Sequence, residues 1–271
     1  MASARWQPTL LVRASIALHV LALVTLIAAP GLWRWVLGVA LVNHGLITLV
    51  GLWPRSRWLG PNWIRLPAAA AAKNEIALSI DDGPDPAVTP QVLDILDRYA
   101  ARATFFCIGE KAARYPELCR EIVRRGHAVE NHTQHHRHSF SMLGVKRLTR
   151  EIQAAQDTLG SITGYTPLFF RAPAGLRNPL LDPVLYRLGL RLVAWTRRGF
   201  DTRTADPAAV SRRLLQSLKS GAILLLHDGH CAHSASGVPV IVAVLPALLE
   251  AAAAAGLRLV TLRDALPAEK T

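Results

Sequence analysis

Residues 75–84 read Glu-Ile-Ala-Leu-Ser-Ile-Asp-Asp-Gly-Pro, and this stretch decides the class of fold. Ile76–Ile80 is a short, mostly apolar run with the length of a buried strand. Two adjacent carboxylates, Asp81 and Asp82, follow it directly, and Gly83-Pro84 then turns the chain. In α/β barrels, functional side chains lie where strands end, so this stretch predicts the first strand of such a domain.

Short strand patterns and helical patterns continue to alternate after this stretch. The further strand patterns are Ala103–Ile108, His127–Glu130, Leu168–Arg171, Arg191–Trp195, Ala222–Leu226 and Arg258–Leu262. The helical patterns are Thr89–Tyr99, Pro116–Arg125, Val145–Leu159, Leu181–Leu188, Pro207–Lys219 and Val238–Ala255. This alternation predicts an α/β fold with a mainly parallel sheet and helices outside it.

The N-terminal quarter has a different character. Only 18% of the chain is charged while 51% is apolar, which indicates an unusual apolar segment. Thr9–Ala29 and Trp35–Trp53 are apolar runs of 21 and 19 residues, and Pro30-Gly31 separates them. As helices, each spans roughly 30 Å, the thickness of the hydrocarbon core of a bilayer. We therefore expect a two-helix transmembrane hairpin, because a cleaved signal peptide would not be followed at once by a second long apolar run.

The charge pattern predicts the orientation of that hairpin. Residues 1–66 contain six arginines and no acidic residue, so they carry +6 of the net +12. Five of the arginines lie toward the end of the hairpin that is opposite the turn, and only Arg34 lies in the turn. The positive-inside bias then places the C-terminal domain in the cytoplasm, beneath a bacterial-type inner membrane in which the chain is integral. Membrane lipid is one expected partner.

Cysteine usage and charge also exclude several classes of protein. The three cysteines, Cys107, Cys119 and Cys231, show no CxxC spacing, which argues against a zinc ribbon or a disulfide framework and agrees with a reducing compartment. Part of the positive charge belongs to the membrane flanks, and no nucleic-acid-binding motif occurs, so nucleic acid is not an expected partner. The expected organisation is a hairpin with basic flanks over 1–66, an alanine-rich linker over 67–74 and an enzymatic domain over 75–271.

Polar side chains gather at the predicted strand ends. Arg171 ends the fourth strand pattern, Asp201 follows the fifth, and His227 follows the sixth. A histidine in that place can act as a general acid near neutral pH. Arg171 and Asp201 could form an ion pair that orients a catalytic carboxylate.

A carboxylate and two imidazoles form a candidate metal site. Asp82 follows the first strand, and His132 and His136 follow the third. The i, i+4 spacing of His132 and His136 would place both imidazoles on one side of a helical turn. Three mixed oxygen and nitrogen ligands leave positions open for water and substrate, which is typical of a catalytic metal site. We expect the neighbouring His135, His138, His230 and His233 to be loop residues.

Five motifs occur in a fixed order. They are Ser-Ile-Asp-Asp-Gly-Pro at 79–84, Asn-His-Thr-Gln-His-His at 131–136, Arg-Ala-Pro-Ala-Gly at 171–175, Trp-Thr-Arg-Arg-Gly-Phe-Asp at 195–201 and Leu-Leu-Leu-His-Asp at 224–228. Together they resemble the polysaccharide deacetylase family with the NodB homology domain, carbohydrate esterase family 4, over about residues 73–265. The resemblance implies a distorted (β/α) barrel of about seven strands and metal-dependent hydrolysis of acyl groups on sugars.

The resemblance also implies roles for single residues. Asp81 would be the general base and His227 the general acid, with Asp82, His132 and His136 as ligands of Zn²⁺ or of another divalent transition metal such as Co²⁺. Arg171 would pair with Asp81, and Asp201 would support Asp81 or His227. Pro173 and Ala174 would line the site of the substrate, where a backbone N–H near Ala174 and the metal hold the oxyanion.

The sequence departs from the family pattern in the lining of the site. Ile80 replaces a usual Phe, Ala174 stands where Tyr is common, Arg198 occupies a usual Asp position, and Thr202 replaces a Trp that lines the groove. The residues with implied chemical roles are all present, so the departures affect the identity of the substrate and not the reaction.

The expected function is a membrane-anchored, metal-dependent hydrolase that removes an N-acetyl or similar acyl group from an amino sugar in a polysaccharide or a lipid-linked glycan. One alternative is a cell-wall or exopolysaccharide deacetylase whose domain faces the periplasm. Another is a catalytically inactive membrane scaffold that binds carbohydrate, against which the intact Asp81, Asp82 and His227 argue.

Overall fold

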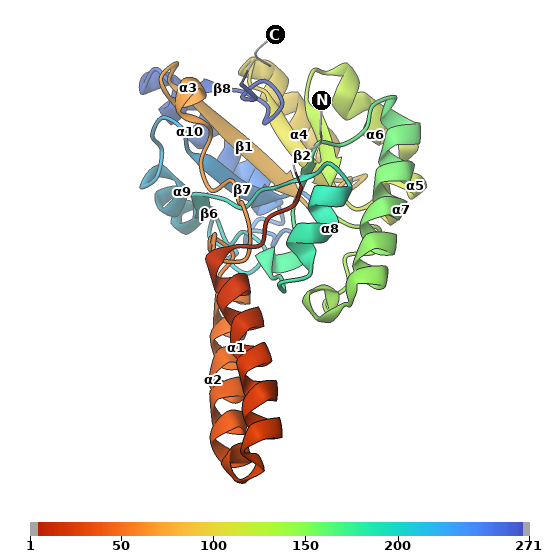
Figure 1. The fold of residues 1–271 in the computed structure, drawn as a ribbon. Coiled ribbons are helices and arrows are strands. Elements are labelled where there is room, and N and C mark those ends of the chain that lie inside the picture. The colour runs from red at the N-terminus through yellow and green to blue at the C-terminus, as the bar shows by residue number, and fades with distance from the viewer. Residues whose placement is uncertain (1–4, 268–271) are drawn as a thin grey trace.

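A computed structural model describes residues 5–267 as a helical hairpin joined to an α/β domain (Figure 1). The hairpin consists of α1 (Leu10–Ala28) and α2 (Trp33–Gly51), with a 3₁₀ turn at Pro30–Leu32 between them. Both arms are long and apolar enough to cross a membrane, and the rest of the protein covers little of either. The break at Pro30 lies where the sequence predicts it.

The few polar groups of the hairpin bond within it. Asn43 Nδ2 on α2 donates a hydrogen bond of 2.9 Å to Ser15 Oγ on α1, and the rings of His19 and His44 lie 5.1 Å apart. The Arg13 guanidinium bends back to Gln7 Oε1 and the Pro8 carbonyl, so its charge lies near the beginning of the helix. These contacts satisfy polar groups that would otherwise be costly in a hydrocarbon environment.

The α/β domain is built on a curled sheet of eight parallel strands. The strands are β1 (Glu75–Asp81), β2 (Ala103–Cys107), β3 (Ala128–Asn131), β4 (Phe169–Phe170), β5 (Arg191–Leu192), β6 (Arg197–Arg198), β7 (Ile223–His227) and β8 (Arg258–Leu259). Their order is β5-β4-β3-β2-β1-β7-β6, and β8 pairs with the beginning of β1. The predicted distorted barrel is confirmed, with one strand more than expected.

Helices cover the outside of the sheet. They are α3 (Ala68–Ala71), α4 (Thr89–Arg98), α5 (Gly109–Arg114), α6 (Pro116–Arg124), α7 (Val145–Thr163), α8 (Leu181–Arg187), α9 (Pro207–Leu215) and α10 (Val240–Ala254). The largest apolar cluster joins β1, β2 and β7 to the inner faces of α4, α9 and α10. Its members include Ile80, Phe105 and Leu226, each at most 1% exposed.

The segment after the hairpin pairs with the chain that follows the edge strand β5 and with the chain that precedes β7. Trp63 forms a parallel bridge with Val193, just beyond β5, and Arg65 forms an antiparallel bridge with Ala222, just before β7. The Leu66 N–H donates to Gly221 O at 2.9 Å, and the Trp63 ring packs on Phe169. Residues 63–66 therefore close the barrel at the gap that the short edge strands leave open.

Three local features differ from the sequence prediction. The predicted strand Arg191–Trp195 ends at Leu192, because the next residues turn to pair with Trp63, and a separate strand β6 follows. Helix α5 was not predicted, since its six residues carry too short a pattern. The expected linker 67–74 contains the one-turn helix α3, in which Ala70 is buried against the barrel.

Candidate active site

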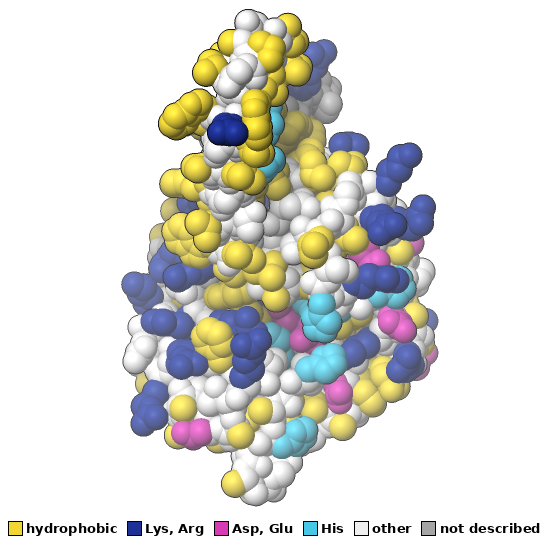
Figure 2. All heavy atoms as spheres, turned by 90° about the horizontal axis from the view of Figure 1, so that it is seen from below, with side chains coloured by type: hydrophobic (Ala, Val, Ile, Leu, Met, Phe, Trp, Pro, Cys, Tyr) yellow, Lys and Arg dark blue, Asp and Glu magenta, His cyan; other side chains and the backbone are white. Residues whose placement is uncertain are grey.

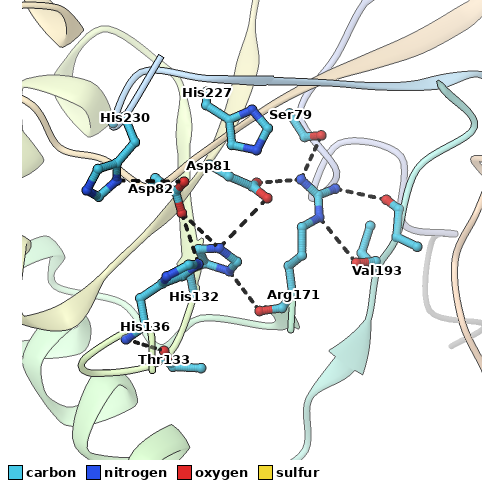
Figure 3. Close-up of polar contacts among 12 residues, drawn as sticks. Ser79, Asp81, Asp82, His132, Thr133, His136, Arg171, Val193, His227 and His230 are labelled. Atoms are coloured by element: carbon cyan, nitrogen blue, oxygen red, sulfur yellow. Dashed lines mark hydrogen bonds and ion pairs between the residues drawn. The ribbon is translucent and has the colours of Figure 1, made fainter. Parts of the chain in front are cut away.

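The polar residues that the sequence singles out meet at one end of the barrel (Figure 3). Asp81 and His227 are the last residues of β1 and β7, which pair side by side. Arg171 directly follows β4, and its N–H donates to Asn131 O at the end of β3. Parallel strands end at the same edge of a sheet, so residues far apart in the chain are brought together.

Asp82, His132 and His136 form a compact group of potential ligands. One ligand atom from each lies within 4.8 Å of the others. Asp82 Oδ1 is 3.3 Å from His132 Nε2 and 3.2 Å from His136 Nε2. That oxygen is buried and accepts no hydrogen bond from the described residues, which is costly unless a cation binds there. A carboxylate oxygen and two imidazole nitrogens suit a divalent transition metal, so the residues fit the metal that the sequence predicts.

The backbone at this group is irregular. Asp82, Thr133 and His136 have φ angles of +73°, +66° and +50°, a region that non-glycine residues rarely adopt. His136 therefore lies in a loop, and the predicted helical turn through His132 and His136 is wrong. The loop is held by hydrogen bonds from the Thr133 N–H to Asn131 Oδ1 and from the His136 N–H to Thr133 Oγ1. Such strained backbone is common at functional sites.

A backbone contact fixes the orientation of His132. Its Nδ1 lies 2.8 Å from the carbonyl oxygen of Arg171, which can only accept a hydrogen bond. Nδ1 therefore carries a proton, and Nε2 is the ring nitrogen that faces Asp82. In metal-binding histidines, the ring nitrogen that does not bind the metal usually donates to a fixed acceptor, as Nδ1 does here.

The electrostatics of the group favour a bound cation. Burial on its own raises the pKa of Asp82, but the interaction with His132 and the charges of His227 and His136 hold it well below its usual range. Burial, together with the charge of His132, lowers the pKa of His136 to about 4. At neutral pH the carboxylate is thus ionised and His136 is neutral, and these are the forms that bind metal.

Arg171 holds Asp81 in place. This arginine is fully buried, and its Nη1 donates to Asp81 Oδ1 at 2.6 Å and to Ser79 Oγ at 2.9 Å. Its Nε and Nη2 donate to the carbonyls of Val193 and Ala194. Asp81 Oδ2 lies 3.9 Å from His132 Nε2, beside the candidate metal site.

Asp201 and His227 form a second pair, and His227 ends the strand next to that of Asp81. The backbone N–H of His227 donates to Asp201 Oδ2 at 2.7 Å, and His227 Nδ1 lies 2.9 Å from Asp201 Oδ1. Burial lowers the pKa of His227, but the hydrogen bond and charge of Asp201 outweigh it and raise that pKa above its ordinary value of 6.5. The suggested ion pair between Arg171 and Asp201 is wrong: each binds a different partner.

These groups surround one cavity of about 620 Å³. Ala174, at φ +53°, lines it, and Pro173 beside it is buried. His135, His138 and His230, expected only as loop residues, also line the cavity, and His230 Nδ1 lies 4.0 Å from Asp82 Oδ2. No spacing in the sequence would have assigned His230 to the site, although it follows His227 closely.

Comparison with known proteins identifies the family. A family model described as polysaccharide deacetylase matches residues 68–193. A peptidoglycan-N-acetylglucosamine deacetylase of Bacillus cereus is 35% identical over 193 residues, which make up 70% of this chain and 87% of the relative. The chain belongs to the polysaccharide deacetylase family.

Two further relatives extend this finding. A chitooligosaccharide deacetylase of Azorhizobium caulinodans is 36% identical over 165 residues, covering 60% of this polysaccharide deacetylase and 78% of the relative. The crystal structure of a peptidoglycan N-acetylglucosamine deacetylase, in complex with 4-naphthalen-1-yl-N-oxidanyl-benzamide, superposes with a TM-score of 0.68 at 25% identity, over 76% of this chain and 92% of that one. The resemblance seen in the sequence is confirmed, and the hairpin precedes the part that the family model matches.

The ligand group predicts a specific pattern of metal loss. We expect about one divalent cation per chain in the purified protein, and we expect Asp82→Ala and His132→Ala to lose it. Loss of an outer-shell partner lowers metal affinity roughly 10–100-fold, and loss of a direct ligand should lower it further. The measurement is metal analysis by plasma mass spectrometry after dialysis. His138→Ala, an exposed histidine of the same loop, is the matched control and should keep the metal. Full metal content in Asp82→Ala would contradict the assignment.

Proposed function

We propose that this chain is a membrane-anchored, zinc-dependent deacetylase that hydrolyses the acetamido group of an N-acetylated amino sugar. The observation that carries the proposal is the joint placement of the Asp82, His132 and His136 group, Asp81 and His227 around one cavity. The names of the relatives support it, since both refer to glycans of N-acetylated amino sugars. The glycan substrate is polymeric or lipid-linked.

Asp82, His132 and His136 would hold the metal. Three protein ligands with nitrogen and oxygen donors are the usual set of a catalytic zinc site, and Co²⁺ suits the same donors. When bound, such a cation lowers the pKa of a coordinated water and polarises a carbonyl oxygen.

Asp81 would act as the general base. Its Oδ1 is held by Arg171 at 2.6 Å, which leaves Oδ2 to accept a proton from the attacking water. The buried guanidinium fixes the direction of this carboxylate, and a fixed base loses little freedom when substrate binds. Arg171 is thus a positioning residue.

His227 would protonate the departing nitrogen. Because Nδ1 interacts with Asp201, Nε2 is the ring nitrogen that is available on the cavity side. The hydrogen bond and the charge of Asp201 raise the pKa of His227, which favours the protonated imidazole that a general acid needs. The backbone N–H near Ala174 would stabilise the oxyanion, a role that needs no particular side chain.

We further propose that α1 and α2 span a bacterial-type inner membrane and that the deacetylase domain, residues 75–271, lies in the cytoplasm. Residues 1–66 contain no acidic residue, and five of their six arginines lie toward the end of the hairpin that is opposite the turn. This distribution supports the orientation. The exposed Trp33 and Trp35 lie at the beginning of α2, and the exposed Trp53 and Trp58 follow its end, as in two interfacial belts.

Removal of the base tests the function. We expect Asp81→Asn to retain the metal but to lose about 10²–10⁴-fold in kcat, because general base catalysis contributes on that order. The measurement is acetate release from soluble N-acetylglucosamine oligomers by the full-length protein in detergent. Asp85→Asn, a carboxylate in the turn after Pro84, is the matched control. Unchanged acetate release by Asp81→Asn would contradict the base assignment, and no release by the parent protein from any N-acetylated sugar would contradict the function.

The Asp201–His227 pair predicts a change in the pH profile. In the parent protein we expect kcat/KM to fall at high pH as His227 loses its proton. Asp201→Asn removes the anion that raises the pKa of His227, so the high-pH limb should move to lower pH while the amide oxygen can still accept the backbone N–H. The control Asp206→Asn, at the beginning of α9, should leave the limb in place. An unmoved limb in Asp201→Asn would show that another group controls it.

Reporter fusions test the orientation. A periplasmic alkaline phosphatase joined after Thr271 should be inactive, and the same reporter inserted after Gly31 in the hairpin turn should be active, because the two points lie on opposite sides of the bilayer. A cytoplasmic reporter at each point should give the reverse result. Phosphatase activity of the C-terminal fusion would contradict the cytoplasmic placement.

A further inference from the structure

The cavity opens on the face of the molecule from which the hairpin projects. Figure 2 views the molecule from the hairpin end, and histidine and carboxylate side chains are visible in the middle of that face, with Lys and Arg side chains on both sides. The described histidines and carboxylates that line the cavity include Asp81, Asp82 and His136. A bilayer that holds the hairpin would therefore lie on the side toward which the cavity opens.

The end of the hairpin is built into the wall of this cavity. The Arg177 N–H donates to the carbonyl of Gly51, the last residue of α2, at 3.2 Å. Pro54 lies against Gly175, where a Cβ would be 2.6 Å from the Pro54 Cβ and 2.7 Å from the Trp195 ring. Gly175 and Trp195 line the cavity. The end of α2 and Pro54, three residues beyond it, thus contact the segment 175–177, which begins at the cavity wall.

The part of the wall next to Trp195 carries an excess of positive charge. Residues 197–213 contain five arginines, and none of them forms an ion pair with a carboxylate in the described part of the chain. The two acidic residues of this segment are already engaged: Asp201 binds His227, and Asp206 accepts the N–H of Ala208. Arg198 and Arg203 line the cavity. The part of the wall that these two arginines form is therefore positively charged.

Aromatic rings hold the Arg198 guanidinium in place. Its Cζ lies 5.7 Å from the centre of the Trp195 ring and 5.0 Å from that of Phe200, and Arg213 lies over the same Phe200 ring at 4.8 Å. Arg198 Nε is buried and has no hydrogen-bond partner among residues 5–267. A guanidinium that is fixed by stacking and lacks a carboxylate presents its N–H groups in the planar geometry that suits phosphate oxygens.

We propose that the substrate is an amino sugar joined through phosphate or diphosphate to a membrane lipid, and that Arg198 and Arg203 bind the phosphate. This proposal rests on the deacetylase function proposed above. The lipid stays in the bilayer beside α2, the phosphate binds at the arginines, and the acetamido group reaches Asp81 and His227. A neutral glycan would leave this arginine wall without a counter-charge, so a polymer fits the cavity less well.

The reaction leaves the lipid linkage intact. Water adds to the amide carbonyl, the amide C–N bond breaks, and acetate and a free amine on the sugar are formed. The phosphate ester bond is not altered. Because both substrate and product carry the phosphate, the arginines contribute to the binding of both.

A comparison of three substrates tests the proposal. The full-length protein is placed in phosphatidylcholine vesicles and given N-acetylglucosamine diphosphoryl polyprenol in the same vesicles, the soluble N-acetylglucosamine 1-phosphate, or a neutral chitooligosaccharide. We expect the highest kcat/KM for the lipid-linked sugar and a lower value for the soluble phosphate, with the neutral oligomer lowest. A neutral oligomer that is hydrolysed while the lipid-linked sugar is not would overturn the proposal and leave the deacetylase function standing. Hydrolysis of none of the three would overturn the function itself.

Variants give a second measurement that does not depend on turnover. Binding is measured by equilibrium dialysis of radiolabelled N-acetylglucosamine diphosphoryl farnesol, a short-chain analogue, against Asp81→Asn protein in nanodiscs. Adding Arg198→Gln or Arg203→Gln should raise Kd about tenfold, the loss expected for one hydrogen bond to a charged group. Arg212→Gln, an exposed arginine of the same segment that does not line the cavity, is the matched control and should leave Kd unchanged. Equal affinity for the lipid-linked sugar and a neutral chitooligosaccharide, or equal loss in Arg198→Gln and Arg212→Gln, would overturn the proposal.

Discussion

The buried guanidinium of Arg171 is the interaction on which the site and the barrel both depend. It has no exposed surface, and its charge is balanced by Asp81 and surrounded by acceptors on Ser79, Val193 and Ala194. Its own carbonyl oxygen accepts the proton of His132. One residue therefore joins β1, the end of β4 and the chain beyond β5, and fixes both a carboxylate and a potential metal ligand. Removing either partner of such a buried pair leaves an unpaired charge, which typically costs about 3–5 kcal/mol.

The sequence predicts the architecture well where its pattern is long. The strand patterns predict a parallel α/β barrel, because runs such as Ile76–Ile80 are almost wholly apolar. In the structure this strand is buried along its whole length. The sequence could not predict β6 or helix α5, because both are short and are stabilised by their neighbours in the fold. The closing segment 63–66 was also missed, since its backbone pairs with Val193 and Ala222, contacts that no local pattern encodes. Tertiary contacts decide such elements.

The site follows the same rule. Residues at strand ends, such as Asp81, Arg171 and His227, could be assigned from the sequence because parallel strands place their ends at one edge. The partners within the site were harder to assign, and the proposed Arg171–Asp201 pair is absent because Arg171 binds Asp81 and Asp201 binds His227. The loop through His136 also differs from the expected helical turn, since its positive φ angles depend on hydrogen bonds to Thr133 and Asn131.

The pairing of residues 63–66 with Val193, after β5, and with Ala222, before β7, has a kinetic consequence. The chain passes from the apolar hairpin into the barrel backbone with no free spacer, so in a membrane the cavity stays at a fixed height above the lipid headgroups. The domain cannot swing outward to search the surrounding solution. Encounter with any substrate held in the same leaflet then occurs by lateral diffusion in two dimensions. The quantity that governs the rate is the surface density of substrate, in molecules per unit area, and not its bulk concentration.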